Sequence, residues 1–221
     1  MPKRNDVDLS EFVRIPGTNV CISKRCEVSG TGWEDTHFML AEEGFFMPTP
    51  ALVAKYLVGV NRAAKNRSRL YDGAGNPIDW YSSVKLLELV YGRNSNEKNI
   101  WTWLDAKFVE GSGYDGLDIE TEHRVVRKRL VGKRKRLEKI VGKKHFSKGD
   151  NVCCVQLKFN DQGLPVKSSK EPRYKVAESM YFMHPREDDV LYYNTTMGPC
   201  LFGRGSYTSG RGTLKCLKVR K

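Results

Sequence analysis

Apolar residues recur at helical spacing in the first half of the chain. The clearest case begins at Thr49 and Pro50, because threonine suits the helix cap and proline the first helical position. The apolar stripe that follows consists of Leu52, Val53, Tyr56, Leu57, Val60 and Ala64. This spacing predicts an amphipathic helix with one buried face.

Two further helices are predicted in the same half. One covers residues 33–43 and ends at Gly44, a residue that readily adopts the left-handed conformation of a helix C-terminus. The other covers residues 80–91, between a cap at Asp79 and a stop at Gly92. Its expected inner face is formed by Trp80, Val84, Leu87 and Tyr91.

The period changes to two from about residue 99, which is typical of strands. The alternating segments are 100–108, 117–126, 153–159, 175–184, 190–194 and 214–219. The first two flank the turn at 111–116 and predict a hairpin. We expect 175–184 and 190–194 to form a second hairpin.

The order of these elements predicts an α+β fold, with a helical N-terminal half packed on an antiparallel sheet formed mainly by residues after 99. We divide the chain into a helix-rich region, 1–98, and an antiparallel β region, 99–221, within one compact domain. The β region contains a basic arm or ribbon at 127–148.

Positive charge is concentrated in one segment. The net charge is +12, and residues 124–148 hold twelve of the 38 Lys and Arg residues, with Glu138 as their single acid. The rest of the chain is therefore close to neutral. A local basic segment favours a polyanionic partner, because neutralising phosphates releases condensed counterions.

The basic segment contains a short repeat, in which Leu130-Val131-Gly132-Lys133 recurs as Ile140-Val141-Gly142-Lys143. Two glycines disfavour one long helix, so we expect two short strands or an extended arm. A β-ribbon could lie in a nucleic-acid groove, whereas a flexible arm would become ordered on binding. The predicted phosphate contacts are Arg127, Lys128, Arg129, Lys133, Arg134, Lys135, Arg136, Lys139, Lys143 and Lys144.

Secondary contacts are predicted on two other segments. The predicted helix that begins at Pro50 carries Lys55, Arg62 and Lys65 on its outer face, and Arg69 follows it. No acid occurs between Pro48 and Tyr71. The C-terminal segment from Val190 contains no Asp or Glu and adds Arg204 and Arg211. Each segment also has a purely structural interpretation, as a solvated helix surface or as a glycine-rich hairpin loop.

These observations predict a protein that binds nucleic acid, DNA or RNA, without sequence specificity. No helix-turn-helix, zinc-finger or RNP pattern is visible, so we expect contacts to backbone and shape. An acidic protein partner for the basic segment is the other interpretation of the charge.

A metal-dependent nuclease is the enzymatic alternative. Asp105 and Lys107 form an acid-x-Lys pair on one predicted strand, and Asp118, Glu120 and Glu122 share one side of the next. This pattern is similar to that of restriction-like nucleases, in which acids hold a divalent ion and a lysine orients water. A Mg²⁺-dependent phosphodiesterase would follow from it. The predicted order of strands, however, differs from the mixed sheet of that fold.

A third alternative is a structural or assembly protein of a nucleoprotein particle, which would self-associate through sheet edges. We expect no membrane partner, because the longest apolar run, 51–60, is too short to span a bilayer. The charged N-terminus has no secretory h-region. These features predict a cytoplasmic, nucleoid-associated or nucleoprotein-associated location rather than secretion.

No cofactor is predicted. The six cysteines are interpreted as reduced, mostly buried thiols, although Cys21, Cys26, Cys200 and Cys216 could form a four-thiolate zinc site if the ends of the chain met. The four histidines are scattered and are interpreted as surface or capping residues. They are His37, His123, His145 and His184.

Overall fold

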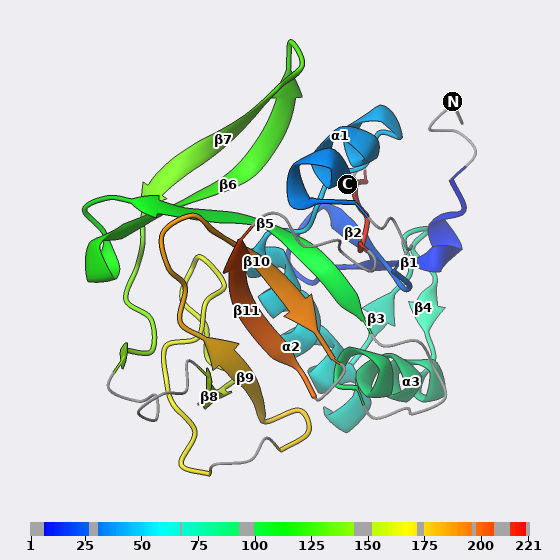
Figure 1. The fold of residues 1–221 in the computed structure, drawn as a ribbon. Coiled ribbons are helices and arrows are strands. Elements are labelled where there is room, and N and C mark those ends of the chain that lie inside the picture. Colours follow the sequence, from blue (N-terminus) through cyan, green and yellow to red (C-terminus); the bar gives the residue numbers. More distant parts are fainter. Residues whose placement is uncertain are drawn as a thin grey trace.

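The computed structural model (Figure 1) describes the following parts of the chain: residues 7–26, 31–66, 68–92, 100–143, 152–171, 175–195, 198–205 and 213–219. These parts contain three α-helices, α1 (Trp33–Glu42), α2 (Pro50–Asn66) and α3 (Trp80–Val90). Short 3-10 turns lie at Leu9–Glu11 and Tyr114–Gly116.

A seven-stranded sheet forms the centre of the structure, in the order β7-β6-β5-β10-β11-β9-β8. Its strands are β5 (Trp101–Glu110), β6 (Leu117–Val126), β7 (Arg129–Arg136), β8 (Val152–Gln156), β9 (Ser179–Met183), β10 (Asp189–Asn194) and β11 (Cys200–Gly205). Neighbouring strands are antiparallel except β9 and β11, which are parallel.

Two smaller sheets accompany the large one. The three-stranded sheet has the order β1-β2-β12, with β1 (Phe12–Arg14), β2 (Val20–Ser23) and β12 (Cys216–Lys218). The remaining pair is β3 (Leu70–Tyr71) with β4 (Pro77–Ile78). Because β12 pairs with β2, segments from the two ends of the described chain share one sheet.

The period-two pattern of β5 places different residues on the two faces of the large sheet. Leu104, Ala106 and Phe108 belong to a core cluster that also contains the buried stripe of α2. Trp103 belongs instead to a second cluster, together with Trp33 of α1. Helices therefore cover both faces of β5, and Figure 1 shows α2 crossing behind the sheet.

The α+β class is confirmed, but three finer predictions are wrong. The sheet is mixed rather than antiparallel, and the helices share the first 98 residues with β1 to β4. The predicted hairpin of 175–184 with 190–194 does not form. The strand β11 lies between β9 and β10, because β10 pairs with β11 over six residues.

Both edges of the large sheet are blocked against further strand pairing. The β7 edge carries four consecutive exposed cations, Lys133–Arg136, and such charges oppose edge-to-edge association. At the other edge, the Gln156 amide donates to the Lys167 carbonyl and the Ser169 amide donates to the Cys154 carbonyl. A segment of the same chain therefore covers β8.

Helix α3 begins at the predicted residue, but its buried face is shifted. Ser83, Leu86 and Val90 face inward, whereas the Trp80 side chain, expected inside, is half exposed. The cap is Asp79, whose Oδ1 accepts from the Ser82 amide at 2.9 Å and whose Oδ2 accepts from the Ser82 hydroxyl at 2.6 Å.

We predict that Asp79→Ala lowers the free energy of unfolding by about 1 kcal/mol, because the first-turn amide of α3 loses its acceptor. Urea denaturation measures this change. The matched control is Asp161→Ala, which removes an exposed carboxylate that caps no helix of the described chain. An equal loss in both variants would contradict the assigned role of Asp79.

Candidate nucleic-acid interface and the histidine cluster at its base

Strands β6 and β7 form a two-stranded ribbon that extends away from the rest of the sheet (Figure 1). Its tip is a two-residue turn, Arg127-Lys128, with φ angles of 47° and 61°. Positive φ at both positions is the requirement of a type I′ turn, which Asn-Gly satisfies with less strain. The structure places two basic residues at the tip of a ribbon, but its strands are not the two short strands predicted within 127–148: β7 pairs with β6, while Ile140 and Val141 of the second repeat are buried.

One face of the ribbon is basic and carries exposed apolar groups. The register pairs Arg124 with Val131 and Val126 with Arg129, and directly paired residues of antiparallel strands point to the same side. Alternation along β7 adds Lys133 and Lys135 to this face. Val126 and Val131 are 49% and 52% exposed. We call this surface, formed by Arg124, Val126, Arg129, Val131, Lys133 and Lys135, the ribbon face.

Ion pairs hold two cations in the middle of β7, Lys133 and Arg134. Arg134 Nε donates to Asp118 Oδ2 at 2.9 Å, and its Nη2 donates to the Glu110 carbonyl at 2.5 Å. Lys133 Nζ donates to Glu122 at 2.6 Å. The hydrogen bond from Arg134 lowers the pKa of Asp118, and the one from Lys133 lowers the pKa of Glu122.

The other predicted contacts divide into three groups. Lys143 pairs with Asp115 at 2.8 Å. Lys144 and Arg211 lie outside the described residues, as does the side chain of Arg204. Exposed cations with no ion pair to another described residue are Arg127, Lys128, Arg129, Lys135, Arg136 and Lys139.

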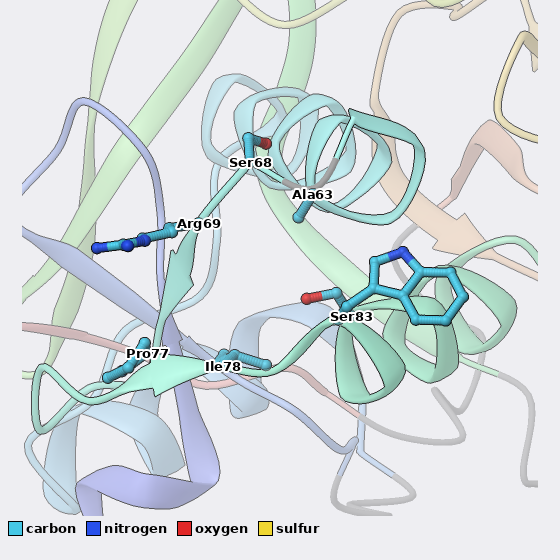
Figure 2. Close-up of a pocket in the computed structure, with 7 residues that line it drawn as sticks. Ala63, Ser68, Arg69, Pro77, Ile78 and Ser83 are labelled. Carbon is cyan, nitrogen blue, oxygen red and sulfur yellow. The ribbon is translucent and has the colours of Figure 1, made fainter.

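Of the six secondary candidates, the structure brings three together. Lys55, Arg62 and Arg69 line one groove of ≈ 800 Å³ between α2 and residues 157–163, while Lys65 is exposed on the same helix. Arg69 also borders a smaller pocket of ≈ 420 Å³, where Figure 2 shows it above Pro77 of β4. These residues form a second basic surface, separate from the ribbon.

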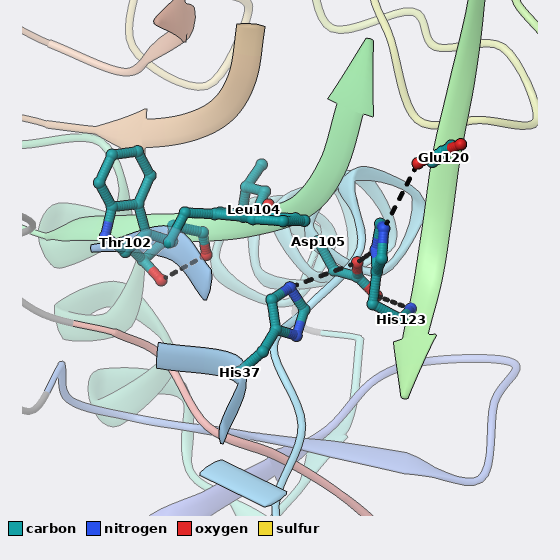
Figure 3. A network of polar contacts seen from close by, with 8 residues as sticks. His37, Thr102, Leu104, Asp105, Glu120 and His123 are labelled. Atoms are coloured by element: carbon teal, nitrogen blue, oxygen red, sulfur yellow. Dashed lines mark hydrogen bonds and ion pairs between the residues drawn. The ribbon is translucent and has the colours of Figure 1, made fainter. Parts of the chain in front are cut away.

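Three polar side chains converge at the base of the ribbon, each 4% exposed: His37 from α1, Asp105 from β5 and His123 from β6 (Figure 3). Asp105 Oδ1 lies 2.5 Å from His123 Nδ1 and 3.6 Å from His37 Nε2. Asp105 Oδ2 accepts from the His123 backbone amide at 3.0 Å. This buried carboxylate therefore connects three elements of the fold.

A β-bulge turns His123 inward. The register of β6 with β7 shifts between Thr121 and Arg124, and Glu122 has a φ of 55°. The prediction that Glu122 shares one side of the strand with Asp118 and Glu120 is therefore wrong. His123 points into the molecule, where its ring lies 5.0 Å from the ring of Trp33.

Burial also corrects the interpretation of His37 as a surface or capping residue. Its ring lies 4.5 Å from the ring of Trp33, and its Nε2 has no hydrogen-bond partner. Burial lowers the pKa of His37 to about 4, outweighing the opposite effect of Asp105. Trp33 and His37 are four residues apart and share the inner face of α1, which is the one sequence signal for this position.

The nuclease candidates are only partly brought together. Asp105 lies in the histidine cluster, and Glu120 Oε2 is 3.9 Å from His123 Nε2. Asp118 is held by Arg134, and Lys107 pairs with Asp188 at 3.8 Å. Within the described residues, the one group of three His, Cys, Asp or Glu donors within 4.8 Å of one another is His37, Asp105 and His123.

The four cysteines proposed as zinc ligands do not meet, although all four lie in the described chain. Cys21 and Cys216 lie in the three-stranded sheet, while Cys200 is in β11. Burial raises the pKa of Cys26 and of Cys200 to about 12, which keeps both as neutral thiols. The alternative interpretation, free and mostly buried thiols, agrees with the structure.

Comparisons of this chain with protein-family models, with curated proteins and with solved structures found no match. None of the helices in the described residues combines the length and the apolar character that crossing a membrane requires. The function is therefore inferred from the residues themselves.

Gly132 provides a test of how tightly the ribbon packs on the cluster. A Cβ at this position would lie 2.4 Å from His123 Nε2, so Gly132→Ala must displace the imidazole from Asp105. We predict a loss of about 1–3 kcal/mol in the free energy of unfolding, measured by urea denaturation.

The matched control is Gly142→Ala, the equivalent glycine of the sequence repeat. There a Cβ meets only the end of the Tyr114 side chain, at 2.8 Å. We expect little loss of stability, because the phenol can move. Equal stability of the two variants would mean that the position of His123 is not constrained by β7.

Proposed function

We propose that this protein binds nucleic acid without sequence specificity, using the β6–β7 ribbon as its main contact. The observation that carries the proposal is an exposed two-stranded ribbon with cations at its tip, Arg127–Arg129, and with Arg124 and Lys135 on one face, none of which has an ionic partner among the described residues. Such unpaired cations repel one another, and a row of phosphates would relieve this repulsion.

The dimensions of the ribbon favour duplex DNA as the ligand. The major groove of B-DNA, about 12 Å wide, admits a two-stranded β-ribbon. The corresponding groove of A-form RNA is deep and narrow and excludes side chains. On the ribbon face, Arg129 and Lys135 would contact phosphates, and Val126 and Val131 would contact sugars or base methyl groups.

Backbone strain at the tip supports the same function. Arg127 and Lys128 occupy left-handed conformations that cost non-glycine residues roughly 1–2 kcal/mol each. Strain of this kind is typical of functional positions. Basic residues at the tip can reach phosphates on both sides of a groove.

The geometry supports binding better than either alternative. The Asp105 side chain is 4% exposed and is enclosed by His37 and His123, so a phosphodiester could not reach its carboxylate without opening of the fold. Both sheet edges are blocked, which disfavours polymerisation through strand pairing. A location on nucleic acid inside the cell belongs to the same proposal.

Removing two unpaired cations of the ribbon face should weaken binding and reduce its salt dependence. For Arg129→Gln combined with Lys135→Gln, we expect the slope of log affinity against log salt to fall by about 2, since each lost phosphate contact removes about 0.9. Fluorescence anisotropy with labelled duplex DNA measures this, with single-stranded DNA and RNA in parallel.

The matched control removes two exposed lysines beside the opposite edge of the sheet, by Lys167→Gln with Lys170→Gln. It has the same net charge as the ribbon variant. If both variants lose the same affinity, net charge rather than the ribbon controls binding.

Replacing the tip should change stability and binding in opposite directions. Arg127→Asn with Lys128→Gly relieves the left-handed strain, so we expect the free energy of unfolding to rise by about 1 kcal/mol. Affinity for duplex DNA should fall, because two phosphate contacts are lost. A more stable variant with unchanged affinity would show that the tip does not contact the ligand.

A further inference from the structure

The cluster at the base of the ribbon has the composition of a metal site. Its donor atoms come from three different elements and point toward a common centre (Figure 3). Exposed clusters of acidic side chains are common in proteins that bind no metal ion there. These three side chains, in contrast, are almost completely buried. Buried polar groups are normally satisfied, so the contacts of each donor indicate what the cluster can hold.

His37 Nε2 is the donor that the protein alone does not satisfy. It is buried, has no hydrogen-bond partner and lies 3.6 Å from Asp105 Oδ1. That separation is too long for a good hydrogen bond. It is close to the spacing of about 3.3 Å between two ligands of a tetrahedral zinc ion.

The surroundings of His123 also fit a ligand. Its Nδ1 faces Asp105, and its Nε2 faces Glu120 at 3.9 Å, as in the carboxylate–histidine–metal arrangement that orients ligating imidazoles. His123 Nδ1 and Asp105 Oδ1 lie 2.5 Å apart, at the short end of hydrogen-bond distances. A cation bound by both atoms would take the place of the hydrogen between them, and the two atoms would move apart by roughly 0.8 Å.

We propose that His37 Nε2, Asp105 Oδ1 and His123 Nδ1 bind one divalent transition-metal ion of the Zn²⁺ class. Two imidazoles with one carboxylate select such ions over Mg²⁺ and Ca²⁺, which prefer oxygen ligands. The ion would join α1, β5 and β6 at the base of the ribbon and would stabilise the bulge. The proposal does not depend on nucleic-acid binding.

The test uses the full chain after chelation and dialysis. Titration with Co²⁺ should give visible d–d absorption at one equivalent, without the thiolate charge-transfer absorption of cysteine ligands. Zn²⁺ should displace the Co²⁺ and raise the Tm, whereas Mg²⁺ should do neither. Absence of stoichiometric Co²⁺ binding, or a thiolate band, would overturn the proposal.

Two histidine variants locate the site. His37→Gln should still fold, because His37 Nε2 has no hydrogen bond to lose, and it should weaken Co²⁺ binding by roughly tenfold or more. The control is His184→Gln, another buried histidine near an aspartate, Asp115, outside the cluster. It should bind Co²⁺ as the unmodified chain does. Equal binding by His37→Gln and the unmodified chain would contradict the assignment.

Discussion

The buried carboxylate of Asp105 is the constraint on which the arrangement of sheet, helix and ribbon depends. It accepts from both the backbone and the imidazole of His123, and it faces His37 across the interface between α1 and the sheet. A carboxylate buried without such partners would be strongly destabilising. Residues of β6 before the bulge, such as Leu117 and Ile119, are therefore held in the core, while those after it extend into solvent.

The cations of the ribbon divide into paired and unpaired ones. Arg134 and Lys133 are held by Asp118 and Glu122, whereas Lys135 and Arg136, nearest the base, have no ionic partner among the described residues. Pairs that are this exposed contribute little to stability individually. Towards the end, the cations at 127–129 have no ionic partner among the described residues. The tip of the ribbon thus carries cations that no described carboxylate neutralises.

The spacing of apolar residues along the chain predicted much of this fold, because it depends directly on which side of each helix or strand is buried. The period of two in β5 and the apolar stripe of α2 correspond to faces that pack on one another. The glycines of the basic segment correctly disfavoured a helix there. The parallel pairing of β9 with β11 was not predictable, since it depends on which strands meet across a long chain separation. The histidine cluster was missed for a related reason: a single bulge at Glu122 reverses the side on which His123 lies, and no residue type near it marks the bulge.

The most direct test of the account is a titration of isotope-labelled protein with a short DNA duplex, followed by NMR of backbone amides and methyl groups. Binding through the ribbon predicts that the largest shift changes occur at residues 124–136, including the methyl groups of Val126 and Val131. Residues 167–170, beside the opposite edge of the sheet, should be unaffected. Changes confined to the groove formed by Lys55, Arg62 and Arg69, with the ribbon unperturbed, would contradict the account.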